Sequence, residues 1–412
     1  MEWKEVRLGD VCNLIAGFAF KAKDFGEFPT KVIKIGDIKP PFVDYVGQVG
    51  VDISCYDINK LSKYTVRYGD YVLAMTGATI GKVGKYISEH PSYINQRVLK
   101  FAPKLDVDAD YINYTICSNI FAKYVVNYID SESAQPNISA PTISKFVFRI
   151  PKEKDDQRRI ASILSSLDRK IELNNKINAD LEEMAQAIFK NWFVDFEPFK
   201  DGKFVDSELG MIPEGWKVVT LDDLTSKFGT GLNPRKNFVL GHGNNYYVTI
   251  KNMGNNRIYL NDRCDKVDDE ALAKINKRSK LQKGDLLFSG IGTIGRVAMI
   301  VDDPINWNTS ESVFNMHPID TVSSEFIYLL LLSDKFQQYV QQNAQGGVQQ
   351  GIRMASLKAF QFAIPDDLNL FDNLVKPIIS KVKSNDKEND ALSLLRDTLL
   401  PRLMSGELEV PE

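Results

Sequence analysis

Two glycine-rich segments contain residue types found in phosphate-binding loops, but neither has the spacing that this chemistry needs. Residues 77–83 read Gly-Ala-Thr-Ile-Gly-Lys-Val. A phosphate loop has four residues between its glycines, and a hydroxyl after its lysine binds Mg²⁺. Here three residues separate the glycines, and Val83 stands where the hydroxyl belongs. The twin segment, residues 290–296, ends in Arg296 and has no lysine. We therefore interpret both as a strand and a tight turn.

Other catalytic and metal chemistry has little support in the sequence. A DNA amino-methyltransferase needs an acceptor side chain before Pro-Pro-aromatic, but residues 39–42 read Lys-Pro-Pro-Phe, and lysine cannot accept a hydrogen bond. The chain has three histidines and no Ser/His/Asp context. Its four cysteines include no Cys-x-x-Cys pair, which predicts a reducing cytoplasm and no metal site. The longest apolar run, residues 326–332, is too short to cross a membrane, and the N-terminus does not have the pattern of a signal peptide.

Cations and amides next to turns and strand ends suggest a different chemistry, the binding of nucleic acid. Arginine pairs bidentately with guanine, and asparagine or glutamine pairs with adenine. The candidates are Lys21, Lys23, Lys82, Asn95, Gln96 and Arg97 in the first half, and Arg235, Lys236, Lys251, Arg278, Arg296, Gln349 and Gln350 in the second. For each residue taken singly, an ordinary surface side chain is the alternative.

The distribution of charge supports this chemistry better than the net charge of −3 does. Residues 1–152 carry 19 Lys and Arg against 16 Asp and Glu, and residues 202–365 carry 18 against 17. The segments that follow them are acidic, with 8 against 11 in residues 153–201 and 6 against 10 in residues 366–412. Residues 274–283 hold five cations and no acid. A basic patch of this kind can contact phosphates locally, although a solvated loop is the alternative.

The two mildly basic segments are copies of one another. Gly69-Asp70 recurs as Gly284-Asp285, 215 residues later, and residues 32–38 (VIKIGDI) recur as residues 247–253 (YVTIKNM) at the same offset. Such a period is far too long for a solenoid repeat and has the size of a domain plus a connector. The repeats alternate short runs rich in branched residues with helical stretches near residues 110–124 and 324–339. They therefore predict an α+β fold, present twice and pseudo-symmetric.

The two acidic segments have a heptad pattern. In the first, predicted as a helix over residues 156–193, the seam consists of Leu164, Leu167, Ile171, Asn174, Asn178, Leu181, Ala185, Ile188 and Trp192. In the second it consists of Phe371, Leu374, Ile378, Val382, Asn385, Asn389, Leu392, Leu395 and Leu399, and Pro377 should kink the helix or mark a late start. Each seam has an asparagine pair four residues apart at mid-length, so the two pairs can match if the helices lie antiparallel. The alternative is that each helix packs only on its own domain.

Several longer motifs add a resemblance to a known family. They are residues 164–175 (LSSLDRKIELNN), 189–198 (FKNWFVDFEP), 212–216 (IPEGW) and 395–408 (LRDTLLPRLMSGEL). With these motifs, almost the whole chain resembles the DNA specificity subunit of type I restriction-modification systems. The resemblance implies two target-recognition domains, at 1–152 and 202–365. It also implies two spacer helices, at 153–201 and 366–412, that pair as an antiparallel coiled coil.

The resemblance also implies a function. Each recognition domain would read one half of a bipartite, gapped site in double-stranded DNA, while the helices dock two modification subunits and set the gap. Restriction and translocase subunits would join the complex, and S-adenosylmethionine, ATP and Mg²⁺ would bind to these partners. This chain would hold no cofactor or metal and no catalytic residue. Two alternatives remain open from the residues: a scaffold that binds DNA without sequence preference, and the recognition part of a fused methyltransferase or endonuclease.

Overall fold

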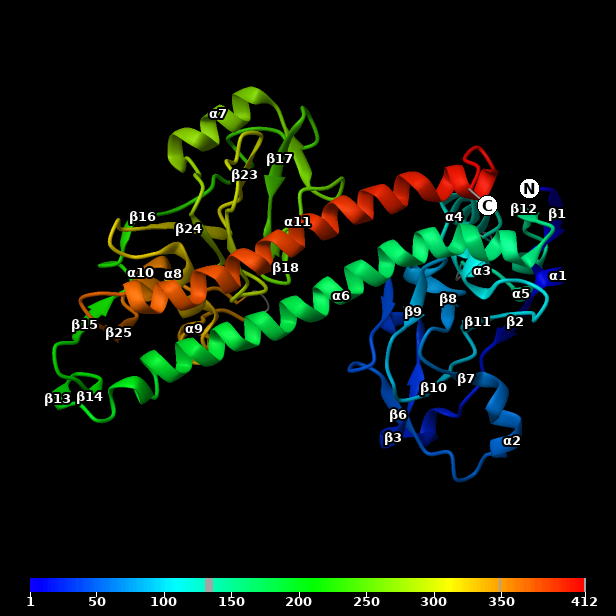
Figure 1. Cartoon of the computed structure of the whole chain (residues 1–412), viewed down its shortest axis with the longest axis horizontal. Coiled ribbons are helices and arrows are strands. Elements are labelled where there is room, and N and C mark those ends of the chain that lie inside the picture. Colours follow the sequence, from blue (N-terminus) through cyan, green and yellow to red (C-terminus); the bar gives the residue numbers. More distant parts are fainter. Residues whose placement is uncertain (130–135, 348–349, 411–412) are drawn as a thin grey trace. The chain divides into compact units, whose positions relative to one another are not determined.

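The structure, a computed structural model, describes residues 1–129, 136–347 and 350–410. The chain forms two compact units (Figure 1). The first comprises Met1–Glu172 and Glu388–Glu412, and the second comprises Leu173–Lys387. Each unit therefore contains one repeat and one half of each long helix.

The first repeat consists of two main sheets and a terminal strand pair. Its strands are β1 (Trp3–Arg7), β2 (Cys12–Ala16), β3 (Phe25–Ile33), β4 (Ile38–Lys39), β5 (Phe42–Val43), β6 (Val49–Val51), β7 (Thr65–Val66), β8 (Tyr71–Ala74), β9 (Val83–Tyr86), β10 (Ser92–Ile94), β11 (Val98–Pro103) and β12 (Val147–Pro151). One sheet has the order β2-β11-β8-β9-β5-β4 and the other β6-β3-β10-β7, while β1 pairs with β12. The helices are α1 (Leu8–Val11), α2 (Ile58–Leu61), α3 (Ala109–Ile116), α4 (Asn119–Asn127) and α5 (Ala140–Ser144), and the 3₁₀ turns are η1 (Ala22–Asp24), η2 (Ile35–Asp37), η3 (Ser62–Tyr64) and η4 (Gly77–Thr79).

The second repeat has the same plan. Its strands are β13 (Phe204–Ser207), β14 (Gly210–Pro213), β15 (Lys217–Thr220), β16 (Thr225–Thr230), β17 (Asn245–Val248), β18 (Met253–Gly254), β19 (Arg257–Ile258), β20 (Asp265–Val267), β21 (Leu286–Ser289), β22 (Val297–Met299), β23 (Trp307–Thr309), β24 (Val313–Pro318) and β25 (Gln361–Ile364). The main sheets are β16-β24-β21-β22 and β20-β17-β23, and β15 pairs with β25. Helices α7 (Asp269–Arg278), α8 (Ser324–Leu332), α9 (Asp334–Asn343) and α10 (Met354–Lys358) complete it, with η5 (Glu197–Phe199) and η6 (Ile250–Asn252). The predicted α+β duplication is confirmed, because each strand of the β2-β11-β8-β9 row has a partner in the β16-β24-β21-β22 row.

The repeated Gly-Asp pair closes a turn before the central strand of each repeat. Gly69 and Gly284 both have a positive φ, +89° and +88°, a conformation that glycine adopts without steric cost. The Asp70 carboxylate accepts hydrogen bonds from the Arg67 N–H (2.8 Å) and from Lys100 (2.7 Å). The equivalent Asp285 is fully buried and lies against His317 (2.8 Å) and Lys227 (3.3 Å). The motif is therefore structural in both copies.

Serine caps break the expected helical stretches into pairs of short helices. The Ser118 hydroxyl accepts from the Phe121 N–H at the start of α4 (3.2 Å), and Ser333 accepts from the Phe336 N–H at the start of α9 (3.4 Å). The hydrogen-bonded caps begin new helices, so the stretches near residues 110–124 and 324–339 are not continuous.

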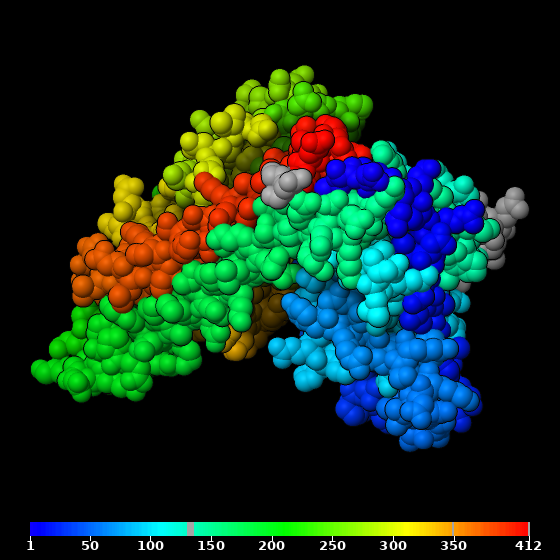
Figure 2. Space-filling view, turned by 45° about the vertical axis from the view of Figure 1, so that its right-hand side comes forward, coloured from blue at the N-terminus to red at the C-terminus, as the bar shows by residue number. Residues whose placement is uncertain are grey.

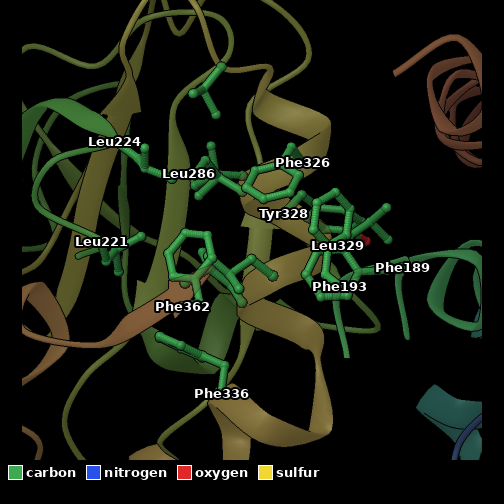
Figure 3. Close-up of a cluster of buried hydrophobic side chains, with 14 of the residues drawn as sticks. Phe189, Phe193, Leu221, Leu224, Leu286, Phe326, Tyr328, Leu329, Phe336 and Phe362 are labelled. Atoms are coloured by element: carbon green, nitrogen blue, oxygen red, sulfur yellow. The ribbon is translucent and has the colours of Figure 1, made fainter. Parts of the chain in front are cut away.

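In the second unit, the long helices α6 (Lys154–Phe193) and α11 (Asn369–Ser405) pack on the repeat and on each other. Figure 3 shows Phe189 and Phe193 of α6 directed toward α8. The ring centroids of Phe193 and Phe326 lie 5.0 Å apart, and those of Phe193 and Phe371 lie 4.8 Å apart. One hydrophobic core of this unit thus includes residues of both long helices and of α8.

The asparagines of the two helices meet in the same unit. The Asn385 amide donates to Asn178 Oδ1 (2.8 Å), and the Asn178 amide donates to Asp386 Oδ1 (3.1 Å). Among the nominated pairing residues, Leu164, Asn174, Asn178, Asn385 and Asn389 are buried, whereas Leu167, Ile171, Leu181, Ile188, Ile378, Leu392 and Leu399 are half-buried. The contact between Asn178 and Asn385 is the one that an antiparallel match of the pairs predicts.

A partly buried polar cluster lies beside this contact. The Asn256 amide donates to the Glu182 carboxylate (3.2 Å), and the Lys383 ammonium donates to the Asn256 carbonyl (3.1 Å). Burial raises the pKa of Glu182 and lowers the pKa of Lys383. The cluster ties the turn between β18 and β19 to both helices within this unit.

In the first unit, the other halves of α6 and α11 meet through Asp168. Its carboxylate accepts from Tyr114 (2.6 Å) and from the Arg396 guanidinium (2.8 Å). The end of α11 also reaches the beginning of the chain, because a Cβ at Gly406 would lie 2.9 Å from the Trp3 ring. Figure 2 shows the residues after α11, in red, beside the N-terminal residues, in blue.

Two details of the predicted helices are wrong. Leu374 and Leu395 are 48% and 47% exposed, so they do not belong to the seam, and buried Val375 lies next to the first of these positions. A late start at Pro377 is also wrong, because α11 begins at Asn369 and continues through the proline. The spacer boundaries at 153 and 366 remain predictions; α6 begins at Lys154 and α11 at Asn369.

Candidate nucleic-acid interface

In the first repeat, three loops are hydrogen-bonded to the end of the central strand β8. The Ala74 N–H donates to the Lys82 carbonyl (3.0 Å) and the Met75 N–H donates to the Arg97 carbonyl (2.9 Å). The Ile138 N–H in turn donates to the Met75 carbonyl (2.9 Å). We call residues 74–82, 95–97 and 136–138 the first turn cluster. It brings together four of the predicted residues, Lys82, Asn95, Gln96 and Arg97.

The second repeat builds the same arrangement at the end of β21. The Ser289 N–H donates to the Arg296 carbonyl (2.9 Å), and the Gly290 N–H donates to the Ser312 carbonyl (2.9 Å). The Ile352 N–H donates to the Gly290 carbonyl (2.9 Å). We call residues 289–296, 310–312 and 350–352 the second turn cluster. Each of its three bonds has a counterpart in the first turn cluster, 214 or 215 residues earlier.

The side chains of the first turn cluster face solvent. Lys82, Gln96 and Arg97 are exposed and Asn95 is half-buried. The hydroxyls of Thr76 and Thr79 are buried, and neither has a hydrogen-bond partner among the described residues. The first turn cluster therefore presents cations and an amide beside two unused hydroxyl groups.

Arg296 of the second turn cluster has an internal role that its sequence position did not reveal. Its guanidinium donates to the carbonyls of Ile250 (2.7 Å) and Met253 (2.6 Å), which begin and follow η6. Lys251, on the same turn, is exposed. Arg296 therefore fixes the turn that presents Lys251, whereas the equivalent Lys82 forms no such bond within the part of the chain that the structure describes.

Three further predicted cations lie beside the second turn cluster. Arg235 and Lys236 are exposed on the loop after β16. Arg278, the last residue of α7, is also exposed, and its guanidinium donates to the Gly231 carbonyl (3.1 Å) and the Thr230 hydroxyl (3.3 Å). Arg278 thus stabilises the loop after β16, and its guanidinium has further N–H donors beyond these two hydrogen bonds.

The remaining candidates are more scattered. Lys21 and Lys23 are exposed beside and within η1, where the Lys21 N–H donates to the Tyr56 hydroxyl (3.1 Å), and the structure does not place them in the first turn cluster. Gln350 is exposed in the second turn cluster, and its carbonyl accepts from the Gly292 N–H (2.8 Å). Gln349 lies outside the described residues.

Glu311 occupies the position of Gln96 in the second repeat and is not among the residues nominated from the sequence. Its carboxylate accepts from the Asn233 amide and from the Tyr247 hydroxyl. Burial, followed by the neighbouring carboxylate, raises the pKa of Tyr247, so the hydroxyl remains a donor. A carboxylate can accept a hydrogen bond from the amino group of cytosine. Aligning the two repeats residue by residue could have revealed this position.

The segments first compared with enzyme motifs are structural. Residues 77–83 form η4 and the start of β9, so the strand-and-turn interpretation is confirmed. Within the described residues, no group of three or more His, Cys, Asp or Glu side chains is placed to hold a metal ion. No helix of the described part combines the length and apolar character needed to cross a membrane.

The chain matches a known sequence family twice, at residues 1–183 and 213–370. That family is described as the type I restriction modification DNA specificity domain. The chain belongs to this family.

Individual members of the family support the assignment over the full length. The chain is similar to the type I restriction enzyme HindI specificity subunit of Haemophilus influenzae, with 25% identity covering 99% of this chain and 100% of that protein. It is also similar to the MjaIX specificity subunit of Methanocaldococcus jannaschii, with 28% identity covering 83% of this chain and 78% of that protein. In fold, it resembles the crystal structure of the type I restriction-modification S subunit from M. genitalium, with a TM-score of 0.55 and 14% identity over 98% of this chain and 96% of that chain.

Proposed function

We propose that the chain is the sequence-specific DNA-recognition subunit of a type I restriction-modification complex. Each repeat reads one half of a bipartite site in double-stranded DNA through its own turn cluster. The observation that carries this proposal is that the two turn clusters use equivalent main-chain hydrogen bonds but present different side chains. Such a design suits two half-sites of different sequence, since base edges are read by side chains.

The side chains at equivalent positions suggest how the half-sites differ. Gln96 of the first turn cluster corresponds to Glu311 of the second, and Arg97 corresponds to Ser312. The amide and the guanidinium fit adenine and guanine, respectively, whereas the carboxylate fits the amino group of cytosine. Side chains at matched positions of the two repeats thus contact the bases of the two half-sites.

The partners belong to the proposal as well. We infer that the paired helices dock two modification subunits and that restriction subunits join through the complex. S-adenosylmethionine, ATP and Mg²⁺ bind to these partners, and this chain contributes no catalytic residue. The chain alone should therefore neither methylate nor cut DNA.

Mapping of methylated adenines tests the proposal. The chain is expressed together with the modification subunit of its operon in cells that lack adenine methylation, and the modified sites are sequenced. We expect one bipartite motif with a fixed gap. Modification without any motif would favour a scaffold that lacks sequence preference and would overturn the proposal.

Two matched variants then separate the half-sites. Gln96→Ala should relax positions in one half of the motif, and Glu311→Gln should change only the other half. Each well-placed base contact is worth about 1–3 kcal/mol, or roughly 5- to 150-fold in affinity. Equal changes in both halves after either substitution would contradict independent reading by the two repeats.

A further inference from the structure

A group of exposed cations distinguishes the second repeat from the first. It lies on the loop after β16, on the second half of α7 and on the segment that follows α7. We call it the cationic flank, and it consists of Arg235, Lys236, Lys274, Lys277, Arg278, Lys280 and Lys283. No carboxylate among the described residues forms an ion pair with any of the seven. Their charge is therefore available to a partner.

Internal hydrogen bonds hold the cationic flank together. The Lys274 ammonium donates to the Asn237 carbonyl (2.8 Å), which joins α7 to the loop that bears Arg235 and Lys236. Arg278 binds the same strand-loop segment through the Gly231 carbonyl (3.1 Å). The cations thus belong to one connected local structure.

Helix electrostatics explain only part of this concentration of charge. Cations in the last turn of a helix are stabilised by its dipole, and this accounts for Lys277 and Arg278. Lys280 and Lys283 follow the end of α7 and gain little from that effect, because it falls off within the last turn. The side chains of Lys280 and Lys283 form no internal hydrogen bond within the described part of the chain. Contacts within the fold therefore do not explain why lysine stands at these two positions.

Among its described residues, the first repeat has fewer cations in the corresponding segment, namely Lys60, Lys63 and Arg67. The corresponding helix, α2, has four residues. There, Lys60 lies 3.9 Å from the Asp57 carboxylate, and the Lys63 ammonium lies over the Tyr64 ring. The duplicated fold therefore does not require the cations of the second repeat.

The cationic flank adjoins the second turn cluster. The Asn308 amide donates to the Ser279 carbonyl at the end of α7 (2.8 Å), and β23 ends one residue later and leads directly into residues 310–312. The Asn233 amide donates to Glu311 within the second turn cluster. DNA bound at the second turn cluster would therefore have its phosphates within reach of the cationic flank.

We propose that the cationic flank binds the phosphate backbone of the duplex beside the half-site of the second repeat, independently of sequence. The inference rests on the proposed function and adds an asymmetry to it: one repeat supplies a larger share of the salt-dependent affinity. Each neutralised phosphate contributes about 0.9 to the slope of log affinity against log salt concentration. Loss of two contacts should therefore reduce the slope by about 1.8.

The test measures the binding of the assembled methyltransferase to its site and to unrelated duplex DNA over a series of salt concentrations. The Lys280→Gln/Lys283→Gln variant leaves α7 and the internal bonds of Lys274 and Arg278 in place. We expect a slope smaller by about 1 to 2, weaker binding to both DNAs at low salt and unchanged base preference. Lys280→Arg/Lys283→Arg should restore the wild-type slope.

A matched control removes the same charge elsewhere in the second unit. Lys203→Gln/Lys335→Gln changes two exposed lysines outside the cationic flank and should leave the slope at the wild-type value. Equal slopes for the test variant, the control and the wild type would overturn the inference while leaving site-specific binding intact. Loss of the modification subunit from the test variant would also overturn it and would identify the flank as a subunit contact. Lack of site preference in the wild-type complex would instead count against the proposed function.

Discussion

Replacement of Arg296 by methionine should loosen the turn that it holds without a direct loss of base contacts. The guanidinium donates to the Ile250 and Met253 carbonyls at 2.7 and 2.6 Å from a half-buried position. A hydrogen bond with a charged donor contributes about 1.5–3 kcal/mol, and water can replace part of it at a half-buried site. The two bonds together should therefore stabilise the turn by about 2–3 kcal/mol.

Two measurements follow from that magnitude. Amide hydrogen exchange in residues 250–253 should become roughly 30- to 150-fold faster in Arg296→Met, since about 1.4 kcal/mol corresponds to a factor of ten. Binding of the assembled methyltransferase should weaken and lose discrimination in the half-site of the second repeat, because Lys251 is no longer held in place. Discrimination in the other half-site should not change.

The equivalent substitution in the first repeat provides the comparison. Lys82→Met removes an exposed ammonium and should leave amide exchange in η2 unchanged, because Lys82 forms no bond to that turn in the described structure. If Arg296→Met altered the preference at a single base while exchange in residues 250–253 stayed at the wild-type rate, Arg296 would read that base directly. It would then not be a positioning residue.

Three further substitutions test the packing of the long helices and of the residue that follows α11. Glu182→Gln should raise the resistance to urea above that of the wild type, and the gain should be larger at pH 7 than at pH 4.5. The pKa of Glu182 is raised in the folded protein, so the folded carboxyl keeps its proton at pH values where the unfolded one has lost it. Wild-type stability therefore falls as the pH rises between these two pKa values, and glutamine removes this loss. Asn178→Leu should destabilise the protein by about 1–3 kcal/mol by leaving the Asn385 amide without its partner, and adding Asn385→Leu should recover most of this loss in urea unfolding. Gly406→Ala should lower the unfolding midpoint by an amount equivalent to about 1–3 kcal/mol. Gly406 has a φ of +78°, and a Cβ there would lie 2.9 Å from the Trp3 ring. An unchanged midpoint would mean that the residues after α11 can move away from Trp3.

The duplicated fold could be predicted from the sequence because the repeated residues have fixed local roles. Gly69 and Gly284 adopt a conformation that suits glycine, and the aspartate after each of them accepts hydrogen bonds across the turn. Such contacts involve residues close in the chain, so their spacing survives duplication. The asparagine pairs of the long helices were predictable for a similar reason, since polar residues interrupt an otherwise apolar seam.

The seam of α11 was harder to predict because the helix packs on more than one neighbour. Its first half buries Phe371, Val375 and Ile379 in the core of the second repeat, so Leu374 faces solvent although it fits a heptad. Further along, the Arg396 guanidinium lies against Asp168 of α6, and Leu395 beside it is 47% exposed. A heptad count treats an arginine as a surface residue, so it does not show that Arg396 pairs with Asp168.

The same limit applied to the turn clusters. The sequence located cations beside turns, but it could not show which side chains were already used by distant carbonyl groups. Arg296 binds Ile250 and Met253, and Arg278 binds Gly231, all more than 40 residues away in the chain. Lys82, with the same sequence context as Arg296, remains exposed. Only the three-dimensional contacts separate a positioning residue from a free cation.

The construction of the turn clusters explains how one fold can carry two different recognition surfaces. The loops are tied to β8 and β21 by peptide groups, as in the bonds from Ala74 to Lys82 and from Ser289 to Arg296. Peptide hydrogen bonds do not depend on the side chain, so substitutions at such positions need not cost folding stability. Exposed side chains on the same residues can therefore vary with the DNA sequence that is read. At Arg296 and Glu311 the side chain itself supports the fold, and at such positions a change in recognition and a loss of structure should occur together.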